Sequence, residues 1–140
     1  MKRHPSLIPL SRDHHDTLII AQSIKNGAPV YKGLPITLEG KKEMVVNHFN
    51  SHLKAHFSKE EILFDKISGN FPEIDELIIQ LKQEHGEIET LVNQIENNDT
   101  MEANLNKLGL LLESHIRKEE RQLFEMIPQK FEESFLAEIK

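Results

Sequence analysis

Two segments of the chain each carry a histidine followed by a glutamate at the fourth position. His56 precedes Glu60 in the first segment, and His115 precedes Glu119 in the second. On an α-helix, residues i and i+4 lie one turn apart on the same face, so each segment presents an imidazole and a carboxylate together. Imidazole and carboxylate groups are ligands for divalent transition metals. The spacing therefore predicts half of a metal site in each segment.

These segments are copies of one pattern. Each continues with a second glutamate directly after the first, and a Leu-Phe pair follows shortly afterwards. Each copy is also preceded by a stretch in which a histidine comes directly after an acid, as in Asp13-His14 and Glu84-His85. We interpret the chain as two similar helical hairpins, each supplying a lone histidine and a His-x-x-x-Glu pair.

The elements that must position these residues are helices, because apolar residues recur at helical spacing along most of the chain. Residues 1–8 are expected to form a loose arm. Thr37 is expected to cap the second helix, residues 27–35 to form a loop, and residues 97–100 to form a turn that also caps the fourth helix. We expect helices over about 10–26, 38–67, 73–96 and 101–126, with Pro128 ending the fourth helix or opening a short terminal helix over about 129–139. The sequence predicts an all-α, up-down antiparallel four-helix bundle with a short extra C-terminal helix, in a single domain over 1–140 with its core at about 10–127.

Composition narrows the classes of function. The 140 residues include 17 Lys+Arg and 23 Asp+Glu, a net charge of −6 that disfavours nucleic acid and anionic membranes as partners. The absence of cysteine excludes a thiolate zinc site, an iron–sulfur centre and a cysteine nucleophile. No apolar run approaches the ~20 residues of a membrane span. The apolar stretch near the N-terminus is short and holds two prolines, so we expect a cytoplasmic protein.

The leucine and phenylalanine that follow each His-x-x-x-Glu pair place the pairs on the inward face. A buried carboxylate must be paired or bound to a metal. Two carboxylates and four imidazoles at one level of a bundle cannot satisfy each other well, whereas two divalent cations can. The histidines expected to serve are His14, His56, His85 and His115. Ligands without sulfur favour iron, manganese or zinc, and an unfilled coordination position could bind a small molecule such as dioxygen.

Several ligand positions stay open on this reasoning. His14 shares a face with apolar residues and is preferred to its neighbour His15. Glu120 remains an alternative to Glu119. His52, one turn before the first motif histidine, is a candidate fifth ligand, and Glu89, one turn after the lone histidine of the third helix, is its rival.

This arrangement resembles the hemerythrin-like family of HHE cation-binding domains. The resemblance covers about residues 10–127 and rests on the two H-x-x-x-E-E segments and the two acid–histidine pairs. It implies a four-helix bundle around a non-haem di-iron centre with oxo and carboxylate bridges. The terminal iron ligands that it implies are His14, His56, His85 and His115. It implies that Glu60 and Glu119 bridge the two irons.

From the residues and the resemblance together, we expect a di-iron protein that binds dioxygen or a related small ligand. Its role would be oxygen, redox or nitric-oxide sensing, storage or iron handling, in a monomer or homodimer. The alternatives are an oxidase or peroxidase-like enzyme, and a structural bundle that its metals, such as zinc, hold together; zinc and manganese are the alternatives to iron as cofactors. Oxygen carriers of the family take two histidines from the third helix, spaced by four, and this chain departs from that pattern at Glu89.

Overall fold

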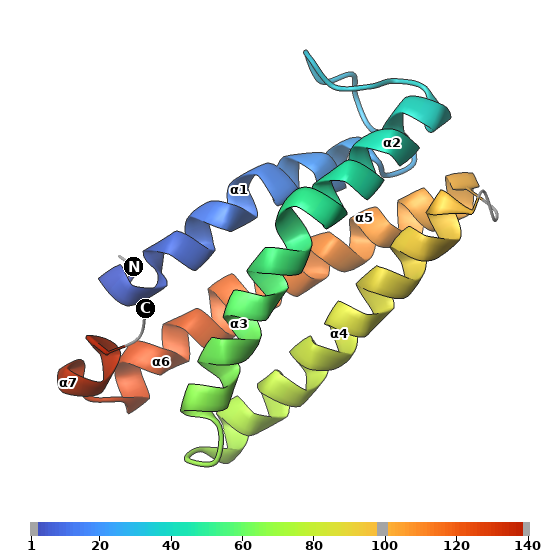
Figure 1. Ribbon diagram of the computed structural model, residues 1–140. Helices are drawn as coiled ribbons and strands as arrows, with labels where there is room; N and C mark the ends of the chain where they lie inside the picture. The colour runs from blue at the N-terminus through green and yellow to red at the C-terminus, as the bar shows by residue number, and fades with distance from the viewer. Residues whose placement is uncertain (1–2, 98–100, 139–140) are drawn as a thin grey trace.

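Four helical arms run up and down alternately in the computed structural model, which describes residues 3–97 and 101–138 (Figure 1). The first arm is α1 (Ile8–Ser23), preceded by a single 3₁₀ turn (Pro5–Leu7). The second arm comprises α2 (Leu38–His48), a π-helical turn (Phe49–Leu53) and α3 (Lys54–Ile67). The third arm is α4 (Pro72–Glu96). The fourth comprises α5 (Met101–Lys118), a π-helical turn (Glu119–Leu123) and α6 (Phe124–Lys130), followed by the short α7 (Glu133–Leu136).

The described residues contain no strand, and the predicted all-α bundle is confirmed. The signals that start and stop helices act as expected in the middle of the chain. The Thr37 hydroxyl accepts a hydrogen bond from the Gly40 amide at 3.0 Å and so caps α2. The second arm ends at Ile67, before the positive-φ Gly69, and α4 begins at Pro72.

The start of the chain differs from the expected loose arm. The first helix begins at Ile8, because Pro9 sits in its first turn, where a missing amide proton costs nothing. Before it, Leu7 is fully buried in the core. The same helix stops at Ser23 rather than near residue 26.

The end of the chain differs as well. Pro128 neither ends the fourth arm nor opens a new helix, since it lies inside α6, which continues to Lys130. The terminal helix is only the single turn α7. The turn expected at residues 97–100, with its cap for the fourth helix, falls largely on positions 98–100, which lie outside the described residues. Residues 139 and 140, at the end of the expected terminal helix, also lie outside them.

The second π-helical turn resolves a difference between the two sequence copies. One residue, Ile62, separates the second glutamate from the Leu-Phe pair in the first copy, whereas Arg121 and Gln122 separate them in the second. A π-helical turn closes over one residue more than an α-helical turn, so it absorbs the insertion. Leu63-Phe64 and Leu123-Phe124 consequently all reach the core.

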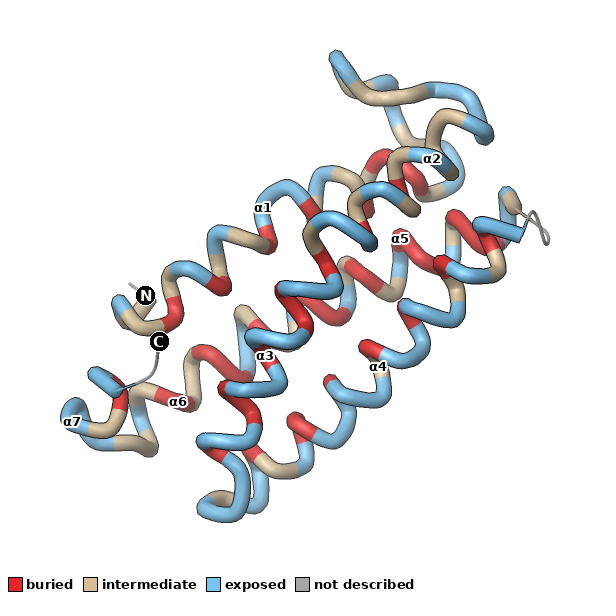
Figure 2. The backbone as a smooth tube through the Cα atoms, in the orientation of Figure 1, coloured by how far each residue is buried: buried red, intermediate tan, exposed pale blue. Residues whose placement is uncertain are grey.

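The core consists of two apolar clusters, with the inner faces of all four arms contributing buried residues (Figure 2). The first includes Leu7, Phe64 and Phe124 near the two termini, and the second includes Phe49, Ile88 and Leu112 toward the opposite end. In the first, third and fourth arms the predicted metal ligands fall between the residues of the two clusters, and in the second arm Glu60 does so, next to His56. The polar site is therefore closed by apolar layers on both sides.

Candidate metal centre

Six buried side chains from the four arms meet between the apolar clusters. They form two groups in which the potential ligand atoms lie within 4.8 Å of one another. The first group consists of His14, His56, Glu60 and Glu119, and the second of His85, His115, Glu60 and Glu119. Each group thus has two histidines of its own, and both groups share the two glutamates.

The Glu60 carboxylate faces both groups at once. One oxygen, Oε2, lies 3.1 Å from His56 Nε2 and 3.4 Å from His14 Nε2. The other oxygen, Oε1, lies 3.0 Å from His85 Nε2. Glu119 instead reaches both groups through one oxygen, because its Oε1 lies 3.0 Å from His14 Nε2 and 3.5 Å from His115 Nε2. A carboxylate with one oxygen toward each group is placed to bridge two cations.

Unsatisfied polar atoms indicate that this centre fits metal ions. Buried polar atoms in proteins almost always have hydrogen-bond partners. In the described part of the chain, the buried side-chain atoms without one all belong to this centre: His14 Nε2, His56 Nε2, His115 Nε2, Glu60 Oε2 and both carboxylate oxygens of Glu119. Several lie close enough for ion pairing but lack hydrogen-bond geometry. Inward lone pairs of this kind suit divalent cations.

Each central histidine is held from outside by an acid on another arm. The bonds join His14 Nδ1 to Glu120 at 2.8 Å, His56 Nδ1 to Asp13 at 2.9 Å, His85 Nδ1 to Glu61 at 2.9 Å and His115 Nδ1 to Glu84 at 2.7 Å. An Nδ1–H that donates to a carboxylate leaves the Nε2 lone pair free and fixes the ring plane. The four bonds connect the arms in a closed ring around the bundle, and each ring nitrogen Nε2 faces inward.

Phenylalanines back the histidines in the same repeated manner. Phe64 stacks on His85 with ring centroids 6.0 Å apart, and Phe124 stacks on His14 at 5.9 Å. These two phenylalanines occupy equivalent positions in the two copies of the motif. Both are fully buried, so they exclude water from one side of the centre.

The electrostatics of the centre favour added positive charge. Burial and the adjacent Glu60 carboxylate raise the pKa of Glu119 well above its usual range. Burial by itself lowers the pKa of His14, but its contacts with Glu119, Glu120 and Glu60 outweigh that effect and raise it to about 11. The pKa of His115 is raised to about 10, again against burial, by Glu119 and Glu60. Two like charges therefore share a buried site that attracts protons or metal ions.

The structure places the alternative ligand candidates from the sequence at different positions relative to the two groups. His14 lies in the first group, whereas His15 is exposed. Glu120 contacts the outer nitrogen of His14. His52 lies outside both groups: its Nε2 is 3.3 Å from the Asp13 carbonyl oxygen, and its ring stacks on that of His56 at 6.2 Å. Its role as a fifth ligand stays a prediction.

Glu89, the rival to His52, also lies outside both groups. Its side chain is exposed and lines a cleft between α3 and α4. Sequence reasoning missed two residues that hold the acid Glu120. Arg3 Nη2 lies 3.1 Å from Glu120 Oε1, and the Ser11 hydroxyl donates to Oε2 at 2.9 Å. Neither residue belongs to a repeated motif, so no pattern in the sequence marked them.

An antiparallel four-helix bundle with a shared His/Glu cluster at its centre defines a class of metal-binding protein. The family model for the hemerythrin HHE cation-binding domain matches residues 10–127. The chain therefore belongs to the hemerythrin HHE cation-binding domain family. No curated protein and no solved structure matches it. None of the described helices is both long enough and apolar enough to cross a membrane.

Proposed function

We propose that this protein is a non-haem di-iron protein that binds dioxygen or a related small ligand. His14 and His56 would hold one iron, and His85 and His115 the other. Glu60 and Glu119 would bridge them. The observation that carries the proposal is the pair of four-residue groups that share both glutamates, because such sharing suits two ions rather than one.

The chain's own residues would prepare the site for ligand binding. Two imidazole nitrogens and two carboxylate oxygens per ion leave positions open in an octahedral shell, where an oxygen bridge and a small ligand can bind. Bound iron would supply the redox chemistry that ligation of dioxygen requires. The outer acids hold each Nε2 inward, and the phenylalanines keep water away. These features favour a binding or sensing role over a dedicated enzyme.

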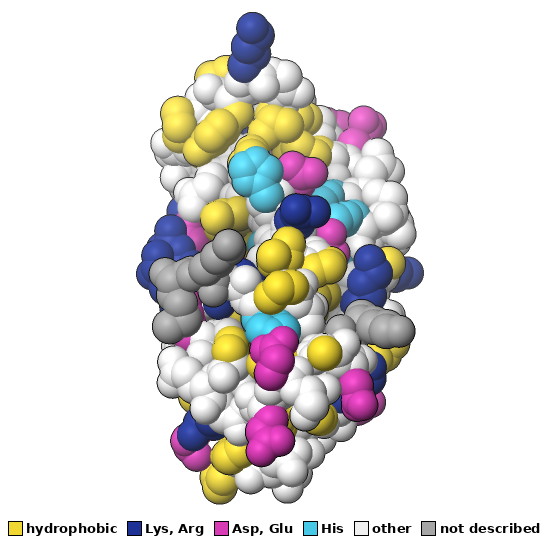
Figure 3. All heavy atoms as spheres, turned by 90° about the vertical axis from the view of Figure 1, so that its left-hand side faces the viewer, with side chains coloured by type: hydrophobic (Ala, Val, Ile, Leu, Met, Phe, Trp, Pro, Cys, Tyr) yellow, Lys and Arg dark blue, Asp and Glu magenta, His cyan; other side chains and the backbone are white. Residues whose placement is uncertain are grey.

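The surface supports the choice of a small ligand over a nucleic acid. On the face shown in Figure 3, acidic and basic side chains are interspersed with apolar ones rather than gathered into one basic patch. Nucleic-acid binding relies on clustered positive charge that displaces counterions. The net charge of −6 points the same way.

The test is a metal count and a visible spectrum of the aerobically purified protein, recorded with and without azide. We expect two irons per chain and oxo-to-iron charge-transfer bands that change when azide binds. Glu60→Gln, which removes a bridging carboxylate, should lose iron and the bands, while Glu87→Gln on the exposed face of α4 should keep both. Stoichiometric zinc in a colourless protein would instead support a structural metal site.

A further inference from the structure

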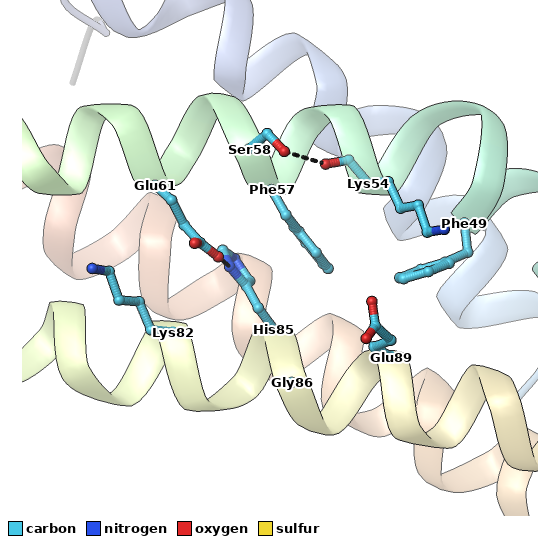
Figure 4. Close-up of a pocket in the computed structure, with 9 residues that line it drawn as sticks. All are labelled: Phe49, Lys54, Phe57, Ser58, Glu61, Lys82, His85, Gly86 and Glu89. Atoms are coloured by element: carbon cyan, nitrogen blue, oxygen red, sulfur yellow. Dashed lines mark hydrogen bonds and ion pairs between the residues drawn. The ribbon is translucent and has the colours of Figure 1, made fainter.

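One surface cleft reaches the metal centre. It runs between α3 and α4 and has a volume of about 450 Å³ (Figure 4). His85, one of the six central residues, forms part of its lining. By contrast, the pocket beside Tyr31 and His48, and the one beside Gln83 and Leu91, contain none of the six.

Phe57 closes the inner end of this cleft. Its ring stacks on His85 with centroids 3.9 Å apart and planes at 14°, and it meets His115 edge-on at 5.8 Å. Figure 4 shows the ring descending from α3 beside the His85 ring, which rises from α4. Only 8% of Phe57 is exposed. A molecule that moves from the cleft toward His115 passes beside this ring, and it would arrive on the His85 and His115 side.

The opposite wall is open at Gly86. A Cβ atom built there meets no atom within 4 Å, so close packing does not explain the glycine. Glycine also weakens a helix interior relative to alanine. Gly86 lines the cleft directly after His85 in the sequence, so we expect a large side chain at this position to narrow it.

Charges along the cleft are balanced. Lys54 and Lys82 line it together with Glu61 and Glu89. Glu61 is engaged with His85, and Lys82 lies 3.3 Å from Asp65. A lining with both signs does not select strongly for one charge. Selection by size at Phe57 then dominates.

We propose that small ligands enter the metal centre through the cleft between α3 and α4, with Phe57 as the gate that selects them by size. This inference rests on the proposed di-iron function. It assigns the ligand-accessible side of the centre to the ion held by His85 and His115. Diatomic and triatomic molecules pass when the Phe57 ring turns, and larger molecules stay in the cleft.

The experiment measures azide binding to the iron-loaded protein by stopped-flow absorption. Gly86→Phe should fill the cleft and slow azide association by about tenfold or more, while Phe57→Leu should speed it several-fold. Because a gate changes entry and exit together, the azide dissociation constant and the spectrum should stay close to those of the wild type. Gln83→Phe, which adds the same ring at an exposed site of α4, is the matched control and should bind azide at the wild-type rate.

A second readout uses the metal-free protein. Diethylpyrocarbonate is an electrophile that modifies neutral imidazoles. It is too large to pass the gate, so it reports access to His85 from the cleft, whose lining includes this residue, and peptide mass spectrometry locates the product. Gly86→Phe should slow modification of His85 several-fold and leave His14 unaffected, and Phe57→Leu should accelerate modification of His85.

The outcomes separate the two proposals. If the wild type binds azide and the Gly86→Phe rate equals that of Gln83→Phe, the entry route is wrong and the di-iron function stands. If the wild type takes up no iron, the di-iron function fails, and with it the assignment of the ligand-accessible ion. Labelling of His85 then decides the remaining claim, that the cleft leads to the centre: equal labelling in all variants overturns it.

Discussion

Histidine orientation at the centre depends on acids that the metal itself would not touch. His56 is set by Asp13 and His85 by Glu61, in each case from another arm. An acid beside the outer nitrogen raises the basicity of the ligand and fixes the proton on Nδ1. The pairs also explain why each lone histidine directly follows an acid, since the acid serves a histidine on a different helix.

The adjacent residues His14 and His15 provide the sharpest test of the ligand assignment. His14→Ala should reduce bound metal and lower thermal stability, because it removes a group that lies 3.0 Å from Glu119. His15→Ala changes an exposed side chain, and its effect on stability should stay within about 0.5 kcal/mol. Metal content and melting temperature are the measurements. Equal metal content in both variants would contradict the assignment.

An outer acid should matter almost as much as a ligand. Glu84→Gln weakens the bond to His115 Nδ1 and the ion pair with Lys118, so metal affinity should fall by about 10- to 100-fold. Competition with a chromogenic chelator measures this change. Glu87→Gln, on the same helix and exposed, should leave affinity unchanged. If the two variants bind metal equally well, the outer bonds do not tune the centre.

His48, which is not one of the proposed metal ligands, should make the stability of the fold depend on pH. Burial and the neighbouring His52 lower the pKa of His48 to about 4. The folded value lies below the unfolded value of 6.5, so His48 stabilises the fold above that pH, and this contribution is lost as the pH falls toward 4. Urea unfolding of metal-free protein at several pH values should therefore show a shallower acid loss in His48→Gln. The exposed His15→Gln should retain the wild-type slope, and an identical slope in His48→Gln would refute the expectation.

The spacing of apolar residues predicts where the helices lie, but it does not predict the π-helical turns that interrupt them. The expected helices match both bounds of α4, the end of α3 and the start of α5, because apolar faces decide where a helix packs. Neither π-helical turn follows from such patterns. The first, at Phe49–Leu53, lies before the first motif, and the second absorbs an extra residue that becomes visible only when the two copies are aligned residue by residue. The first arm also begins earlier than expected. Leu7 is buried in the core, and its packing orders the residues just before α1.

Deleting Gln122 tests the explanation of the second π-helical turn. The deletion gives the second copy the same spacing as the first, so an α-helical turn can replace the π turn and keep Leu123 and Phe124 in the core. Deleting Arg117 is the matched control, since both side chains are exposed in the same arm. The control deletion rotates Glu119 by about 100° relative to His115. We expect the first variant to fold and bind metal and the second to lose both, as judged by circular dichroism and metal content. Equal loss in both would contradict this account.

For the whole molecule, the centre joins all four arms at one level, with an apolar cluster on each side. Sequence reasoning reached the six central residues because the repeat supplies each half independently. It could not say which outer acid meets which histidine, because Glu84 reaches His115 only through the packing of α4 against α5. Nor could it place Phe57 at the cleft, since an apolar pattern does not distinguish a phenylalanine that lines a pocket from one that packs in the core.

The buried acids that join the arms should affect the free energy of unfolding differently in the metal-free and the metal-bound protein. Burial and the adjacent Glu60 carboxylate raise the pKa of Glu119 well above its usual range, so the metal-free protein favours the protonated form of this side chain, which resembles an uncharged amide. Glu119→Gln should therefore change the free energy of unfolding of the metal-free protein by no more than about 1 kcal/mol. The wild type should gain about 2.7 kcal/mol when free metal reaches 100 times the dissociation constant, and the variant, with a bridging ligand removed, should gain much less.

Urea unfolding of both proteins, with a chelator and with ferrous iron under anaerobic conditions, measures the four free energies. Glu102→Gln, an exposed acid on the same arm, should show the full metal-dependent gain. An equal gain in Glu119→Gln would mean that this carboxylate does not bridge the ions. A large loss in the metal-free variant would mean instead that the charged carboxylate holds the arms together without metal. The expected combination, unchanged stability without metal and a lost gain with it, follows only if Glu119 is kept in the core for the cations it binds.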